Sequence, residues 1–182
     1  MIYTAMVPRL TKPVDARDHI RGNAAAAATL VEYGDYASPA CREAESIVKA
    51  IVQVMPAELC VVFRHFPLRQ THPQAQHAAE AAEAAGAQGK FWAMHDYLFE
   101  RQRHLDDAEL LLYGAEIGLN TDRYYDELMR ELYASRVHAD LTSGICSGVI
   151  DTPTFFINGD RHYGPVRFET LLAAIQAAGA QH

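Results

Sequence analysis

The stretch TLVEYGDYASPACREAESIVKAIV, residues 29–52, indicates the fold class of this chain. Its first part, residues 29–33, alternates in polarity and is rich in strand-forming residues. Its last part repeats apolar residues at helical spacing, and these are Ala44, Ile47, Val48 and Ile51. The tetrapeptide SPAC, residues 38–41, lies between the two parts. A serine, a proline and a cysteine therefore stand where a strand gives way to a helix.

The segments on both sides extend this pattern into a strand–helix–strand unit. The first strand is predicted at about residues 28–34. The helix should begin near Pro39 and end near Val54, because Pro56 cannot continue it. The run LCVVFRHFPL, residues 59–68, is short and apolar and is typical of a buried strand. Two strands joined through a helix pair in parallel with a right-handed crossover.

The remaining sequence predicts a helical block followed by a hairpin and a last helix. Residues 71–149 show a helical period throughout and should form about four helices. In the run TPTFFING, residues 152–159, strand character returns and ends at an Asn–Gly turn signal. A closing amphipathic helix would use the apolar residues Phe168, Leu171, Leu172 and Ile175.

Composition excludes several classes of protein. The chain has 182 residues, 49% of them hydrophobic, which is typical of a globular protein with a core. A net charge of −7 argues against nucleic acid as a partner. No window approaches the roughly 18 apolar residues that span a bilayer, so we expect no membrane partner. None of the nine histidines pairs with a cysteine at metal-ligand spacing, so no metal is expected.

The cysteines and the first residues bear on location. No signal peptide is visible in the opening residues, MIYTAMVPRLTKPVDARDHIRG. Three cysteines are an odd and sparse set for a disulfide-stapled secreted domain. Both observations predict a cytoplasmic location.

The order of these motifs resembles the DsbA-like branch of the thioredoxin fold. The resemblance covers nearly the whole chain, and its clearest parts are RDHIRG, LVEYGDYASPAC, VVFRHFPL and GVIDTPTFFINGDRHYGP. It implies an α/β, thioredoxin-like fold (βαβ … ββα) with an inserted all-helical subdomain. The implied organisation is an N-terminal arm (1–23), a thioredoxin-like domain (24–70 and 150–182) and a helical insertion (71–149).

In that family the strand–helix junction reads Cys-Pro-x-Cys. The first cysteine is the nucleophile at the helix N-terminus, and the second resolves the mixed disulfide. By resemblance the nucleophile position falls on Ser38 and the resolving position on Cys41, with Pro39 and Ala40 between them as substrate-binding residues. Two-cysteine exchange is therefore unavailable at this motif.

The family's cis-proline falls on Pro153 and is preceded by Thr152. A proline that merely opens an edge strand is the alternative, and the cis form is favoured. The resemblance implies that the backbone of Thr152 pairs with an extended peptide or with glutathione. Asp151 stands where the family usually has glycine.

Ser38 has three interpretations. Serine is a preferred helix N-cap and Pro39 suits the first helical position, so a cap without redox chemistry is favoured. Alternatively, Ser38 donates a hydrogen bond to the thiolate of glutathione, as in kappa-class glutathione transferases, which the chain would then resemble. A laboratory substitution is less favoured, because trapping variants usually keep the first cysteine.

The other candidates have structural alternatives as well. Cys41 is either a buried small hydrophobe or a slow monothiol. Cys60 begins the second strand, at the end opposite the site, and should pack in the core. Cys146 could approach Cys41 and pair with it. His65 could lie near the site as a base, although packing is favoured.

Two classes of function follow. The first is a thiol–disulfide oxidoreductase of the DsbA-like kind, weak or monothiol because its motif is Ser-Pro-Ala-Cys. The alternatives are a non-catalytic module that binds peptides or partners, and a glutathione-dependent transferase or isomerase that uses Ser38. The expected partners are protein thiols or peptides, with glutathione as the one small-molecule candidate and no other cofactor.

Overall fold

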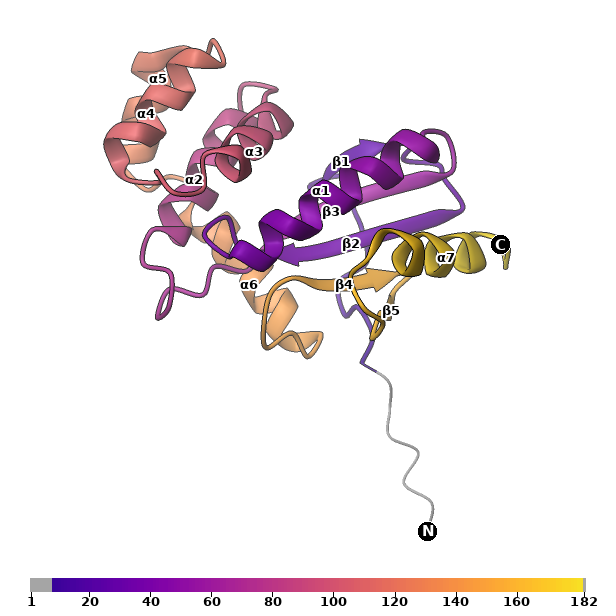
Figure 1. The fold of residues 1–182 in the computed structure, drawn as a ribbon. Coiled ribbons are helices and arrows are strands. Elements are labelled where there is room, and N and C mark those ends of the chain that lie inside the picture. Colours follow the sequence, from indigo (N-terminus) through magenta and orange to yellow (C-terminus); the bar gives the residue numbers. More distant parts are fainter. Residues whose placement is uncertain (1–7, 182) are drawn as a thin grey trace.

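The computed structural model describes residues 8–181, which form a five-stranded mixed sheet covered by helices (Figure 1). The strands stand in the order β1-β3-β2-β4-β5. Their bounds are β1 His19–Gly22, β2 Ala28–Gly34, β3 Leu59–His65, β4 Thr154–Ile157 and β5 Asp160–Arg161. The thioredoxin-like fold expected from the sequence is confirmed.

The strand–helix–strand unit forms as the sequence predicts. β2 and β3 are parallel, in register from Ala28 opposite Leu59 to Gly34 opposite His65. Both strands therefore end at the same edge of the sheet, where the helix α1 (Pro39–Val54) begins. β4 runs antiparallel to β2 on its other side.

The predicted hairpin forms between β4 and β5. Its turn is made by Asn158, with φ of 48°, and Gly159, with φ of 88°. Both residues lie in the left-handed region that a two-residue type I′ turn requires, which explains the Asn–Gly pair.

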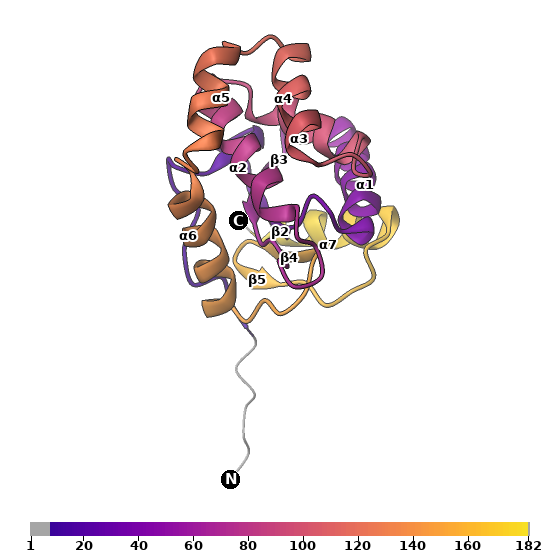
Figure 2. The same ribbon diagram turned by 90° about the vertical axis from the view of Figure 1, so that its left-hand side faces the viewer.

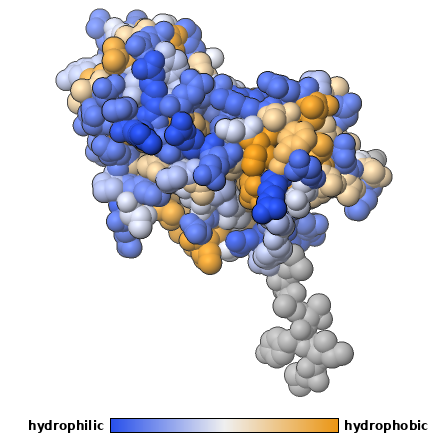
Figure 3. Space-filling view, in the orientation of Figure 1, coloured by the Kyte–Doolittle hydropathy of each residue, from blue (hydrophilic) through white to orange (hydrophobic). Residues whose placement is uncertain are grey.

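Helices α1 and α7 (Phe168–Gly179) lie side by side on one face of the sheet (Figure 1). Alternate β2 residues face them, and Ala28 and Leu30 are buried in a cluster with Ile51, Leu171 and other apolar side chains. The space-filling view shows a hydrophobic area over this pair of helices (Figure 3).

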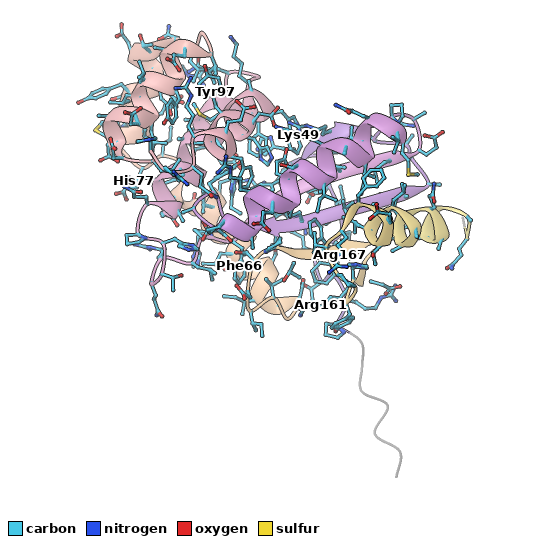
Figure 4. The ribbon with its side chains drawn as sticks, in the orientation of Figure 1. Lys49, Phe66, His77, Tyr97, Arg161 and Arg167 are labelled. Carbon is cyan, nitrogen blue, oxygen red and sulfur yellow. The ribbon has the colours of Figure 1, made fainter. Side chains whose placement is uncertain are left out.

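The opposite face is covered by the helix α6 (Ala134–Cys146) and by the N-terminal arm (Figure 2). Val31 and Tyr33 of β2 point into this layer. Gly144 lets α6 come close, because a Cβ there would lie 2.6 Å from the ring of Phe66. Phe66, labelled in Figure 4, follows the end of β3.

The insertion between β3 and β4 consists of five helices, where about four were expected. They are α2 Ala75–Gly86, α3 Phe91–Glu100, α4 Asp107–Glu116, α5 Thr121–Met129 and α6. Side-chain caps from Asp106 and Asn120 begin α4 and α5. Helices α2 to α5 stand beyond the edge of the sheet where β2 and β3 end (Figure 1), and their core is continuous with Cys41 of α1 and Phe63 of β3.

The N-terminal segment differs from a simple surface arm over residues 1–23. Residues 1–7 lie outside the described part, residues 8–18 follow the surface, and His19–Gly22 forms the edge strand β1, antiparallel to β3. Arg64 of β3 fastens the arm through two hydrogen bonds of 2.9 Å to the Asp18 carboxylate. Both side chains are fully buried.

Among residues 8–181, no helix combines the length and the apolar character that a membrane crossing requires.

Candidate functional site

The site begins at the turn between β2 and α1. Ser38 is the N-cap of α1, in an extended conformation with φ of −80° and ψ of 119°. Its Oγ accepts a hydrogen bond from the backbone N–H of Cys41 at 3.4 Å. Pro39 occupies the first helical position, where its missing N–H costs nothing. The capping role expected for Ser38 is present in the structure.

Asp35 holds this turn in place. Its carboxylate accepts hydrogen bonds from the backbone N–H groups of Ala37 at 2.7 Å and Leu68 at 2.9 Å, and the Nδ1 atom of His72 lies 2.9 Å away. The Asp35 side chain is fully buried. Because one carboxylate ties the turn to the segment after β3, the start of α1 has a fixed position.

Cys41 lies in the first turn of α1 and is fully buried. Burial raises the pKa of its thiol most, and the charge of Glu32 raises it further. The Asp35 N–H, which donates to the Cys41 sulfur at 3.4 Å, and the nearby side chains of Ser38 and Thr152 partly offset both effects, and the pKa is about 12. Cys41 is therefore a neutral, shielded thiol at pH 7, which is a poor first nucleophile.

Glu32 belongs to the site, and sequence reasoning missed it. It lies on β2 in alternation with Ala28 and Leu30, so it faces α1, and it is 2% exposed. Its Oε1 atom has no hydrogen-bond partner among the described residues. Burial, followed by the charge of Glu45, raises the pKa of Glu32 well above its usual range. A glutamate within an apolar alternating strand was the signal in the sequence.

The second half of the site is the loop before β4. The peptide bond between Thr152 and Pro153 is cis. The Oδ1 atom of Asp151 accepts a hydrogen bond from the backbone N–H of Thr152 at 2.8 Å, and the Asp151 carbonyl accepts one from the Thr154 hydroxyl at 2.7 Å. Asp151 therefore organises this loop itself, at the position where the family usually has glycine.

Thr152 lies close enough to the Cys41 thiol to lower its pKa. The Thr152 hydroxyl oxygen is buried and has no hydrogen-bond partner among residues 8–181. Pro153 lines a cleft of about 230 Å³ together with Tyr163 and Val166. Ile150, just before the loop, is 83% exposed.

The remaining cysteines lie apart from this chemistry. Cys60 is opposite Thr29 at the start of the parallel pair, at the end of the sheet away from the site, and it is buried as expected. Cys146 is exposed at the end of α6. All three cysteines are free, so no bridge joins Cys41 to Cys146 in this structure.

The histidines near the sheet edge pack within polar networks. His65 is buried, and its Nε2 atom lies 2.9 Å from Glu83. His95 is fully buried beside Glu45, and its Nδ1 atom lies 3.0 Å from the Tyr36 hydroxyl. The packing interpretation favoured for His65 agrees with these contacts.

Within residues 8–181, two groups of side chains have donor atoms close enough to share a metal ion. They are Glu45 with His95 and Asp96, and His65 with Glu83 and Asp140. Arg21 and Lys49 form ion pairs with the carboxylates of the first group, and Arg136 does so in the second. Arg21 and Lys49 thus balance the two carboxylates of the first group, and Arg136 neutralises one charge of the second.

The sheet order and the meeting of the Cys41 turn with the Thr152–Pro153 loop place the chain in the DsbA-like class of thioredoxin folds. A protein-family model described as thioredoxin matches residues 15–177, and the chain belongs to this family.

Solved structures give the same fold. A thioredoxin-like oxidoreductase from Silicibacter pomeroyi has a TM-score of 0.77 and 28% identity, over 90% of this chain and 93% of that chain. Oxidised BdbD from Bacillus subtilis has a TM-score of 0.79 and 21% identity over the same shares of the two chains. The family is thus one of DsbA-like oxidoreductases.

Curated relatives include much longer proteins. The chain is 45% identical over 172 residues to Na(+)/H(+) antiporter NhaA 3 of Salinispora tropica, covering 94% of this chain and 26% of that protein. It therefore spans about a quarter of the length of that relative, as it does for NhaA 1 of Salinispora arenicola.

Proposed function

We propose that this chain is a partner-binding member of the DsbA-like family, with at most weak monothiol activity. Its ligand is an extended peptide or a protein thiol, held between the start of α1 and the Thr152–Pro153 loop. The observation that supports this best is the state of Cys41, which is fully buried behind a serine cap.

The chemistry of the two motif positions supports the proposal. A serine hydroxyl forms no disulfide, and the dipole of α1 does not ionise it at neutral pH. A thiol whose pKa is raised to about 12 has on the order of a thousandth of the thiolate of an ordinary cysteine at pH 7. Neither Ser38 nor Cys41 is therefore suited to begin thiol–disulfide exchange.

The binding surface does not depend on the lost cysteine. The loop before β4 presents polypeptide backbone beside a small cleft, and its neighbour Ile150 exposes a large apolar side chain. An exposed apolar side chain beside a cleft is suited to an extended partner segment.

Alkylation kinetics test the chemical part of the proposal. The native protein is treated with iodoacetamide near neutral pH, and each cysteine is followed by peptide mass spectrometry. Exposed Cys146 should be alkylated first, and Cys41 at least a hundredfold more slowly than in urea-unfolded protein. Alkylation of Cys41 faster than Cys146 would favour a reactive monothiol instead. Insulin reduction should stay near background.

Peptide titration tests the binding part. A peptide with one cysteine between two valines is labelled with a neutral dye and titrated by fluorescence anisotropy. Ile150→Ser should weaken its binding several-fold, because this side chain stands beside the loop. Val54→Ser is the matched control, since Val54 is 58% exposed at the far end of α1. Equal losses in both variants, or no binding to the wild type, would refute the proposed surface.

Glutathione chemistry is the second candidate. The Ser38 hydroxyl lies at the N-terminus of a 16-residue helix, where an anionic sulfur is favoured. Strong binding of glutathione to the wild type that is lost in Ser38→Ala, measured by calorimetry, would place this function first.

The cytoplasmic location is part of the proposal as well, and it is supported by three unpaired cysteines. Fractionation of cells that express the chain at its native level tests it.

A further inference from the structure

A cleft of about 410 Å³ opens where the loop after α3 meets the first turn of α1. We call it the basic cleft, and its lining residues are Arg42, Glu100, Arg101, Gln102, Arg103 and His104. Three arginines and one histidine thus meet one glutamate in a protein whose net charge is −7. The face shown in Figure 3 is hydrophilic over this part of the molecule.

The basic cleft is joined directly to the candidate site. Arg42 follows Cys41 in the first turn of α1. The side-chain amide of Gln102 donates hydrogen bonds to the backbone carbonyl of Tyr36 at 2.8 Å and to that of Ser38 at 2.7 Å. A ligand in the cleft therefore lies against the same turn that carries Ser38 and Cys41.

Most of the positively charged side chains in the basic cleft form no ion pair with a carboxylate among residues 8–181. Among residues 8–181, no carboxylate forms an ion pair with Arg42, Arg103 or His104. Arg101 lies 3.5 Å from Glu116, and its guanidinium lies over the ring of Tyr97. The aromatic ring and the ion pair hold Arg101 in place at one wall.

Arg42 stands where helices disfavour a cation. The first turn of α1 contains no acidic residue, so the positive end of the helix dipole adds to the charge of Arg42 rather than opposing it. Helix stability does not account for an arginine at this position, whereas attraction of an anion does.

We propose that the basic cleft binds a short acidic segment of the partner, adjacent to the part that lies on the Thr152–Pro153 loop. This inference rests on the proposed function and adds to it the chemistry of the partner: extended backbone at the loop, followed by two or three aspartates or glutamates. The arginine forks suit carboxylates, with which they form paired hydrogen bonds. The small number of cations matches a few carboxylates rather than the phosphate backbone of a nucleic acid.

Two matched peptides test the proposal. Both contain valine–cysteine–valine and carry a neutral dye, and one continues with three glutamates where the other has three glutamines. At about 50 mM salt the glutamate peptide should bind about tenfold more tightly in fluorescence anisotropy, and this advantage should shrink at about 300 mM salt because exposed charges are screened.

Charge variants locate the effect. Arg42→Gln combined with Arg103→Gln should remove the advantage of the glutamate peptide and leave the binding of the glutamine peptide unchanged. Both side chains are exposed, so the fold should be retained, which circular dichroism checks. Arg167→Gln is the matched control, because Arg167 is exposed beside α7, away from the insertion (Figure 4), and lines no part of the cleft.

The outcomes separate the two proposals. Equal affinity for both peptides in the wild type overturns the basic cleft and leaves the peptide-binding function in place. If the wild type binds the glutamate peptide but not the glutamine peptide, and the double variant binds neither, the acidic-segment proposal for the basic cleft is supported. The same result refutes the Thr152–Pro153 loop as a binding surface. If neither peptide binds, both proposals are wrong.

Discussion

The carboxylate of Asp151 accepts a hydrogen bond from the backbone N–H of Thr152, with 2.8 Å between Oδ1 and N. This N–H is one of the backbone groups through which an extended strand would pair with the loop. A partner must therefore compete with a side chain of the protein itself. The loop before β4 lies beside the start of α1, but its Thr152 N–H already donates to Asp151 and is not free to bind a partner strand.

Asp151→Gly should strengthen the binding of an extended cysteine peptide by about three- to tenfold, since one backbone hydrogen bond contributes roughly 1 kcal/mol. Calorimetry on the wild type and the variant measures the difference. Glutathione should gain as well, because a negative charge is removed from the loop.

Asp151→Asn is the control that separates the hydrogen bond from the charge. The asparagine carbonyl can still accept from the Thr152 N–H, so peptide affinity should stay near that of the wild type. If the asparagine variant gains as much as the glycine variant, charge repulsion rather than occupation of the N–H limits binding.

Ser38→Cys should create a redox-active pair. Pro39, the N-terminus of α1 and Cys41 are already in place, so only one sulfur is missing. Gel-shift titration in glutathione buffers should reveal a reversible disulfide, and insulin reduction should rise at least tenfold above the wild type.

Ser38→Ala is the matched control, and it should remain at background in both assays. A Ser38→Cys variant that folds but never oxidises would contradict this prediction. That result would mean that the geometry around Asp151 and Thr152 excludes the partner sulfur.

Glu32→Gln should stabilise the protein at alkaline pH more than at acid pH. The folded state raises the pKa of Glu32 above its unfolded value near 4.3, so the folded protein holds a proton that the unfolded chain releases. The stability gained from this proton is complete below pH of about 4 and is lost as pH rises through the folded pKa. Glutamine stays neutral at every pH, so the Glu32→Gln variant should not lose stability as the pH rises.

Urea unfolding over a series of pH values measures this effect, and Cys41 alkylation at pH of about 10 supplies a second readout. The variant should react faster there, because the charge that raises the Cys41 pKa is gone. Glu43→Gln on the exposed side of α1 is the control. Parallel pH profiles for the wild type and Glu32→Gln would show that Glu32 is ionised in the folded protein.

Local patterns account for what the sequence predicted. The period of β2, the proline limits of α1 and the Asn158–Gly159 turn each act within a few residues, and all three were placed correctly. The edge strand β1 was missed because its four residues, HIRG, show no clear alternation and gain order only by pairing with β3.

The site was predicted less completely for the same physical reason. The positions of Ser38, Cys41 and Thr152 followed from the motif, but the reactivity of Cys41 depends on burial and on Glu32 across the sheet. The hydrogen bond from Thr152 to Asp151 also requires a loop conformation that the residue types alone do not specify.

Asp18→Asn should destabilise the protein by about 3–5 kcal/mol, because it leaves the guanidinium of Arg64 buried without its counter-charge. Burial alone would raise the pKa of Asp18, but the hydrogen bonds from Arg64 and from the Asp15 N–H, together with the charges of Arg64 and Lys12, outweigh it and lower the pKa. The stability that this carboxylate provides is therefore present above its unfolded pKa of about 4 and is lost as pH falls through the folded value.

Urea unfolding at neutral and acid pH should show a large difference in stability between the wild type and Asp18→Asn, and this difference should narrow on acidification. Glu58→Gln, which changes an exposed carboxylate in the turn before β3, should barely change the midpoint. A difference that persists unchanged at acid pH would show that Asp18 acts through packing rather than through its charge.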